Sequence, residues 1–212
     1  MMKDIIPAAV DFARRVFAGD STGHDLAHTL RVYRMARLLA EKEGADLELV
    51  SLAALLHDVD DEKISPGTSE GLDRAMGFLR SADETEERIS AICGIIRQVS
   101  FVGEDSVTPD TAEGKCVQDA DRLDALGAVG IARAFAYGGA HHRAMYDPAI
   151  PPKEHMSREE YRSSRSTTIN HFYEKLLRLE GLMNTDTARH IAGQRTRYMR
   201  EFLEEFFREW GE

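Results

Sequence analysis

The dipeptide His57-Asp58 is the first feature of this sequence with clear chemical potential, because it sets an imidazole beside a carboxylate. It follows the apolar run Leu52 to Leu56 and precedes the acidic segment Asp60 to Glu62. Imidazole is the commonest metal-binding side chain, and a carboxylate supplies hard oxygen ligands. The pair therefore indicates half of a site for a divalent metal ion, and the missing ligands have to come from elsewhere in the chain.

One candidate ligand lies before the dipeptide. His28 has apolar neighbours and stands four residues after His24, so the two imidazoles share a face if one helix contains both. His28 is also compatible with an ordinary buried core residue, and His24 with a helix cap or a surface position.

A second group of candidates lies after the dipeptide. A short helical stretch carries carboxylates at Asp119, Asp121 and Asp124, and the spacing of Asp121 lets it point with the apolar stripe of the helix. A carboxylate buried there needs a metal or another cation as its partner. The ordinary alternatives are a helix cap at Asp119 and an ion pair of Asp124 with Arg122 or Arg133.

The elements that have to position these residues are predicted to be helices. Apolar residues recur at helical spacing along almost the whole sequence, which has no alternating strand pattern. Thr68 or Ser69 is the expected cap of the fourth helix, and residues 157–160 form a capping box for the seventh. The sequence therefore predicts an all-α protein. The expected helices cover about residues 6–17, 26–44, 46–58, 68–79, 84–99, 111–137 with a break at Gly127 or Gly130, 157–181 and 185–207.

The composition limits the class of protein. A chain of 212 residues with 42% hydrophobic and 30% charged residues is expected to form a single globular domain. The formal net charge of -10 disfavours binding to a nucleic-acid backbone, because phosphate contacts need a basic surface. No signal peptide and no apolar run near the length of a membrane span is visible in the sequence. Cys93 and Cys116 form no disulfide framework or metal-binding motif, so a cytoplasmic location is expected.

His28, His57-Asp58 and Asp121 together resemble the H…HD…D pattern of the HD-domain metal-dependent phosphohydrolases. Longer stretches are similar to the soluble bacterial single-domain subfamily, which includes small nucleotide pyrophosphohydrolases. These stretches are Gly-His-Asp-Leu-Ala-His (23–28), Leu-Leu-His-Asp-Val-Asp-Asp-Glu-Lys (55–63), Val-Gln-Asp-Ala-Asp-Arg-Leu-Asp-Ala (117–125), Phe-Ala-Tyr-Gly-Gly-Ala-His (135–141) and His-Phe-Tyr-Glu-Lys-Leu-Leu (171–177). The resemblance implies an all-α HD-domain helical bundle with a C-terminal helical extension. It would form one domain over residues 1–212, with a core at about 20–137, a lid-like loop at 138–156 and C-terminal helices at 157–210.

By this resemblance, His28, His57, Asp58 and Asp121 bind one divalent metal ion, and Asp119 has a supporting or structural place. Members with two metals carry further histidines between the HD dipeptide and the last aspartate, whereas this chain has none between Asp58 and Asp121. A single ion is therefore expected. Two imidazoles and two carboxylates suit Mn first, with Fe, Co, Ni, Zn or Mg as alternatives.

A metal held in this way polarises a phosphoryl oxygen and lowers the pKa of bound water, and the attack also needs a group that orients the water. Asp61 resembles the acidic residue that related hydrolases use for this step, and Glu62 and Asp60 are its alternatives. A solvated acidic turn is the ordinary interpretation of the same three residues. Positive charge for substrate phosphate is expected from His24, Lys63, Arg122, His141 and Lys175.

The implied function is hydrolysis of a phosphate ester or anhydride in a small phosphorylated substrate, with a nucleotide as the first choice. The sharpest version is a nucleoside triphosphate pyrophosphohydrolase, which releases pyrophosphate and a monophosphate. The alternatives are a nucleotidase or phosphodiesterase on the same metal site, and a metal- or nucleotide-binding module without catalysis. Neither a nucleic-acid polymer nor a membrane is expected as a partner. The chain is expected to be a monomer or a homodimer, and the cluster of Phe202, Phe206, Phe207 and Trp210 suits a dimer interface or a core.

Overall fold

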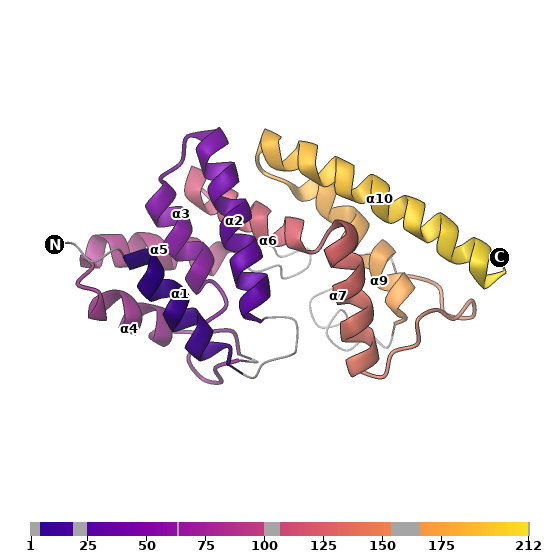
Figure 1. Ribbon diagram of the computed structural model, residues 1–212, viewed down its shortest axis with the longest axis horizontal. Coiled ribbons are helices and arrows are strands. Elements are labelled where there is room, and N and C mark those ends of the chain that lie inside the picture. The colour runs from indigo at the N-terminus through magenta and orange to yellow at the C-terminus, as the bar shows by residue number, and fades with distance from the viewer. Residues whose placement is uncertain (1–4, 19–24, 63, 100–106, 154–165, 212) are drawn as a thin grey trace. The chain divides into compact units, whose positions relative to one another are not determined.

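The computed structural model describes residues 5–18, 25–62, 64–99, 107–153 and 166–211, and the regular structure in these ranges consists of helices without a β-strand (Figure 1). The predicted all-α class is confirmed. His24, Lys63 and the capping box expected at residues 157–160 lie outside the described residues. No helix in the described part is both long enough and apolar enough to span a membrane.

The chain forms two compact units. The first consists of Met1–Ser100 and Val107–Asp121, and the second consists of Phe101–Ser106 and Arg122–Glu212. Helix α6 (Ala112–Asp124) therefore begins in the first unit and ends in the second. The other helices of the first unit are α1 (Ile5–Val16), α2 (Leu26–Glu43), α3 (Leu47–Leu56), α4 (Asp73–Ser81) and α5 (Glu86–Val99). Among the described residues of the second unit, the helices are α7 (Gly127–Ala140), α9 (Thr168–Glu174), the 3-10 helix η2 (Leu176–Leu182) and α10 (Asp186–Trp210).

Helix α3 is the central helix of the first unit and contacts α1, α2 and α5. Every residue from Val50 to Leu56 is buried, as expected for a helix that is apolar on almost every side. The start of α3 is fixed by Asp46, whose carboxylate accepts hydrogen bonds of 2.9 Å from the N–H groups of Glu48 and Leu49. His57 ends the helix, so the core of this unit holds the end that carries the HD dipeptide.

Helix α4 begins later than the sequence indicates. The local capping candidates are residues 68–69, but the helix starts at Asp73. The N–H groups of Arg74 and Ala75 donate to the two carboxylate oxygens of Asp60, at 3.0 and 2.9 Å. The predicted cap at residues 68–69 is therefore wrong, because the side chain that caps α4 is that of Asp60, 14 positions before Arg74.

Helix α10 is the longest helix of the second unit and contacts α7 and η2. The ring centroid of Phe202 lies 6.0 Å from those of Phe135 in α7 and Phe172 in α9. Phe206 stacks on Trp210, with the two centroids 5.4 Å apart. The aromatic residues of the last helix therefore pack against other aromatic residues of the same unit, while Trp210 at its end stays 45% exposed.

Two stretches of the second unit differ from the pattern in the sequence. The expected break is found at Gly127, whose φ is 73°, but α7 then continues to Ala140, so the irregular stretch begins after residue 140. The single helix expected over residues 157–181 is wrong in extent. In the described part, α9 begins at Thr168, and Lys175 with φ -138° and ψ -61° separates it from the 3-10 helix η2.

Candidate metal centre

His28 lies in the first turn of α2, and only 1% of its surface is exposed. The carboxylate of Asp25 caps this helix and accepts a hydrogen bond of 2.7 Å from the backbone N–H of His28. An N-cap of this kind fixes the first turn. The cap therefore also sets the direction in which the buried imidazole points.

His57 and Asp58 stand at the end of α3, and each is 8% exposed. Nδ1 of His57 donates a hydrogen bond of 2.9 Å to the carbonyl oxygen of Ala54, since a carbonyl can only accept. Nε2 is then the ring nitrogen that remains for another partner. This atom is buried and has no hydrogen bond of good geometry within the described part of the chain, although Oδ2 of Asp58 lies 3.2 Å away. A buried polar atom in this state indicates a partner of another kind, such as a metal ion.

The donor atoms of His28, His57, Asp58 and Asp121 converge at one point. Nε2 of His28 lies 3.4 Å from Oδ2 of Asp58 and 3.4 Å from Oδ1 of Asp121. Nε2 of His57 lies 3.2 Å and 3.9 Å from the same two oxygens. The side chain of Asp121 is 26% exposed, whereas the other three are at most 11% exposed. Solvent therefore reaches the cluster from the side of Asp121.

These separations fit one divalent ion. Ligand atoms that lie about 2.0–2.2 Å from a zinc-sized ion are roughly 3–3.5 Å from their neighbours around it. Potential ligand atoms of His28, His57 and Asp58 all lie within 4.8 Å of one another, and the oxygen of Asp121 lies 3.4 Å from His28. Two imidazole nitrogens and two carboxylate oxygens suit a borderline ion such as Mn, Fe, Co, Ni or Zn.

The electrostatics of the cluster also favour a cation. Burial lowers the pKa of His57, but the negative charges of Asp58 and Asp121 outweigh this effect and raise the pKa to about 9. Without a metal ion, His57 therefore holds a proton at neutral pH. A metal ion and this proton compete for Nε2, because the ligand form of histidine is the neutral one.

The three acidic residues after the dipeptide lie in different environments. Asp60 is 2% exposed and caps α4, so the structure does not support it as the group that orients water. Glu62 is exposed, and its carboxylate accepts a hydrogen bond of 2.9 Å from the hydroxyl of Ser69. Asp61 is partly exposed, and its N–H donates to the carbonyl oxygen of Asp58 at 3.0 Å. The backbone therefore ties Asp61 to a residue of the metal cluster.

Three of the predicted substrate-binding residues belong to the second unit. Arg122 is buried, and its guanidinium donates to the carbonyl oxygen of Leu182. His141 is exposed, and its ring stacks on that of Tyr137 with centroids 3.8 Å apart. Lys175 is partly buried and directly follows α9. Arg122 thus has a structural contact within its own unit, and Nδ1 of His141 lies 2.9 Å from the carbonyl oxygen of Tyr137.

Arg143 and His171 are not among the predicted residues, but the structure groups them with Lys175. Burial lowers the pKa of His171, and the positive charges of Lys175 and Arg143 lower it further, to about 3. The guanidinium of Arg143 lies over the ring of Tyr137, 5.4 Å from its centroid. The sequence signal for part of this cluster is the four-residue spacing of His171 and Lys175, which share one helix face. No spacing in the sequence marks Arg143.

A family model for the HD domain matches residues 25–126, and this range contains His28, His57, Asp58 and Asp121. The matched residues therefore include all the side chains that converge at the candidate metal centre. The chain is also similar to proteins of known structure along nearly its whole length.

A protein from Lactobacillus plantarum is 44% identical, with a TM-score of 0.86 and coverage of 99% of this chain and 98% of that one. An HD-superfamily hydrolase from Bacillus thuringiensis is 41% identical, with a TM-score of 0.76 and the same coverage. YpgQ of Bacillus subtilis, whose crystal structure contains ADP, is 35% identical, with a TM-score of 0.75 and coverage of 96% and 97%. Taken with the geometry of the cluster, these matches establish that the chain belongs to the HD superfamily of hydrolases and is a metal-dependent phosphohydrolase.

Proposed function

We propose that the protein is a nucleoside triphosphate pyrophosphohydrolase that uses one divalent metal ion, with Mn as the first choice. The observation that carries this proposal is the convergence of His28, His57, Asp58 and Asp121, whose imidazole nitrogens lie 3.2 to 3.9 Å from the carboxylate oxygens. A nucleotide as the substrate class is supported by the ADP in the structure of the Bacillus subtilis relative.

When bound, the metal ion supplies a Lewis acid for a phosphoryl oxygen and lowers the pKa of water. Under the proposal, His28, His57, Asp58 and Asp121 are its ligands. A carboxylate oxygen of Asp61 accepts the proton of the attacking water. The hydrogen bond from the backbone N–H of Asp61 to the carbonyl oxygen of Asp58 supports this assignment. Glu62 is the second candidate for this role, although Ser69 already donates to its carboxylate.

In the proposed reaction the water oxygen bonds to the α-phosphorus, and the bond from that phosphorus to the α,β-bridging oxygen breaks. Pyrophosphate leaves and a nucleoside monophosphate remains. The charges on the phosphates need cationic partners, and we assign this role to His24, Lys63, Arg122, His141 and Lys175. The cationic surroundings of His171, made by Lys175 and Arg143, support the binding of an anion in the second unit.

The decisive experiment is a panel of nucleoside triphosphates, diphosphates and monophosphates, each assayed with Mn, Co, Ni, Mg and Zn and with both products identified. Pyrophosphate and a monophosphate are the expected products. Orthophosphate would support a nucleotidase, and an opened cyclic ester would support a phosphodiesterase. Metal binding without turnover of any substrate would support a binding module. His57→Ala protein is the matched negative control for contaminating phosphatases.

A further inference from the structure

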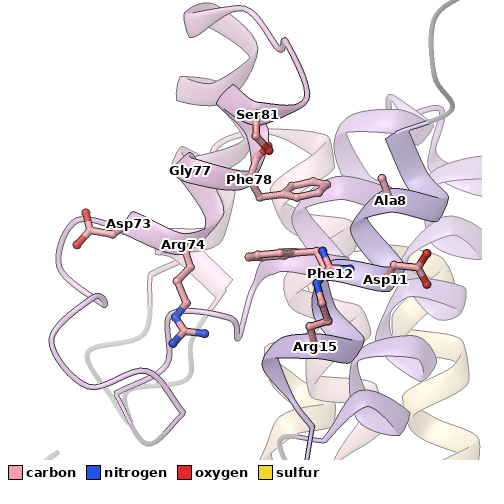
Figure 2. Close-up of a pocket in the computed structure, with 9 residues that line it drawn as sticks. All are labelled: Ala8, Asp11, Phe12, Arg15, Asp73, Arg74, Gly77, Phe78 and Ser81. Carbon is pink, nitrogen blue, oxygen red and sulfur yellow. The ribbon is translucent and has the colours of Figure 1, made fainter.

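A pocket of about 540 Å³ lies between α1 and α4 in the first unit, and none of the four converging metal-centre residues lines it (Figure 2). Sites for small organic ligands usually measure about 300–1,000 Å³. Two stacked aromatic rings, Phe12 and Phe78, line this pocket with centroids 4.8 Å apart and an interplanar angle of 23°. The pocket therefore has the size and an aromatic surface that suit a small planar ligand.

Two arginines from different helices flank the aromatic rings. Figure 2 shows the side chains of Arg15 from α1 and Arg74 from α4 on the same side of the stacked pair. Within the residues that the structure describes, neither guanidinium makes a hydrogen bond or an ion pair. Both groups are therefore available to a ligand.

The two carboxylates in the lining, Asp11 and Asp73, point away from the aromatic rings. Asp11 is paired with Arg14, which does not line the pocket. The carboxylate of Asp73 lies against Gly71, in the space that a Cβ would take there. Figure 2 shows the Asp73 carboxylate turned away from the two rings. The two guanidinium groups are therefore the charged groups of the lining that lie on the side of the rings.

The chemistry of this surface selects a small aromatic anion. Arginine binds phosphate through charge-assisted and often bidentate hydrogen bonds. Aromatic side chains bind the flat face of a nucleobase by stacking, with little dependence on which base is present. A nucleoside monophosphate carries both features, namely a planar base for Phe12, which is partly exposed whereas Phe78 is buried, and a phosphate for Arg15 and Arg74.

Helix α4 connects this pocket to the metal centre. The side chain of Arg74 lines the pocket, while its backbone N–H donates to Oδ1 of Asp60 at 3.0 Å. Asp60 is 2% exposed and stands two residues after Asp58. A displacement of α4 therefore acts directly on the backbone that carries a metal-centre residue.

We propose that the pocket between α1 and α4 is a regulatory site for a nucleoside monophosphate, and that its occupancy alters metal binding through α4 and Asp60. This site goes beyond the proposed hydrolysis. Ligand binding at this site is measured on metal-free protein. A failed binding assay would therefore contradict the regulatory site, whereas a failed turnover assay would contradict the proposed hydrolysis.

The first test measures the affinity of adenosine monophosphate for the full-length, metal-stripped protein by titration calorimetry. Arg15→Ala and Arg74→Ala should each weaken binding by about tenfold or more, since each removes a charged hydrogen-bond partner. Arg14→Ala is the matched control, because it is adjacent on the same helix but paired with Asp11, and it should leave the affinity unchanged. The site would be overturned if adenosine monophosphate did not bind, or bound equally to all four proteins.

Inorganic phosphate provides the control for a purely electrostatic site. It should bind at least about tenfold more weakly than adenosine monophosphate, because it has no base that can stack on an aromatic ring. Equal affinity of the two anions would overturn the role of Phe12 and Phe78.

The second test measures the coupling to the metal centre. Saturating adenosine monophosphate should change the Kd for Mn by about threefold or more, and by linkage Mn should change the affinity for adenosine monophosphate by the same factor. Arg74→Ala is the control for association between Mn and the nucleotide in solution, because such association would change the apparent Kd for Mn in this variant as well. The change in Kd should disappear in Arg74→Ala. Asp60→Asn should also abolish the change. An unchanged Kd in the wild type would overturn the coupling, and a change that persisted in Asp60→Asn would overturn the part assigned to Asp60.

Discussion

The imidazole of His57 is oriented by Ala54, whose carbonyl oxygen accepts a hydrogen bond of 2.9 Å from Nδ1. This contact determines which nitrogen carries the proton in neutral histidine, and it turns Nε2 toward the carboxylate of Asp58, 3.2 Å away. A histidine that binds a metal usually donates its other ring N–H to such an acceptor, which fixes both tautomer and ring direction. The end of α3 therefore presents a preorganised ligand rather than a mobile side chain.

The first prediction follows from this convergence. His57→Ala and Asp121→Ala should each weaken Mn binding by more than about 100-fold, because even the loss of an outer partner costs about 10- to 100-fold. Turnover should be lost in parallel. Titration calorimetry with Mn measures the first effect, and product analysis measures the second. If Asp121→Ala kept metal and activity while Asp119→Ala lost them, the ligand would have to be reassigned to Asp119.

The second prediction concerns pH. The pKa of His57 in the metal-free protein is raised to about 9, so below that pH the metal has to displace a proton from Nε2. Metal affinity should therefore rise roughly tenfold per pH unit up to about pH 9 and then level off. Calorimetric titrations with Mn at pH 6 and pH 8, in buffers of different ionisation enthalpy, measure the affinity and the released proton. A pH-independent affinity would contradict this linkage.

The same pKa shift has an opposite consequence for the metal-free fold. The folded-state pKa of His57, about 9, lies above the ordinary value of 6.5. The protonated imidazole thus stabilises the metal-free protein fully below pH 6.5, and this contribution is lost as pH rises through 9. Saturating metal removes the proton and with it this pH dependence, so melting curves with and without Mn should diverge as pH increases.

The third prediction separates the acidic residues after the HD dipeptide. Asp61→Asn should keep metal affinity but lower kcat by about 10²- to 10⁴-fold, the usual contribution of a general base. Glu62→Gln should change kcat little, because the Glu62 side chain is held by the hydroxyl of Ser69. Steady-state kinetics at saturating Mn distinguishes the two. Full activity in Asp61→Asn together with a large loss in Glu62→Gln would exchange their proposed roles.

Local sequence predicted the features that depend on local chemistry. Helix α3 was predictable because its apolar run is bounded by Asp46, a residue that caps its own first turn. The start of α10 was predictable for the same reason, since Thr185 accepts a hydrogen bond from the N–H of Ala188. The convergence of His28, His57 and Asp121 fits the expected ligand set, although the roles of these residues stay predictions.

Tertiary contacts account for what the sequence did not reveal. The cap of α4 comes from Asp60, 14 residues before Arg74, so no rule based on neighbouring residues could identify it. The same contact explains why Asp60, an acidic residue that looked exposed in sequence, is buried. The break between α9 and η2 at Lys175 could not be predicted from the sequence either, because neither glycine nor proline occupies that position.

The fourth prediction concerns the stability of the second unit in acid. The folded-state pKa of His171 is about 3, because burial and the charges of Lys175 and Arg143 oppose protonation. This value lies below the ordinary 6.5, so the unfolded chain binds the proton first and the protein loses stability as pH falls from about 6.5 toward 3. Between pH 7 and pH 5 this one group should account for up to about 2 kcal/mol of lost stability.

The variant His171→Asn should therefore lose less stability than the wild type between pH 7 and pH 5, and chemical denaturation at the two pH values measures the difference. His190→Asn is the matched control, because His190 is an exposed histidine of the same unit and bonds only to Gln194 among the described residues. The control should follow the wild type. Identical pH dependence in all three proteins would mean that His171 takes up its proton without cost, and the cationic cluster around it would then not form in solution.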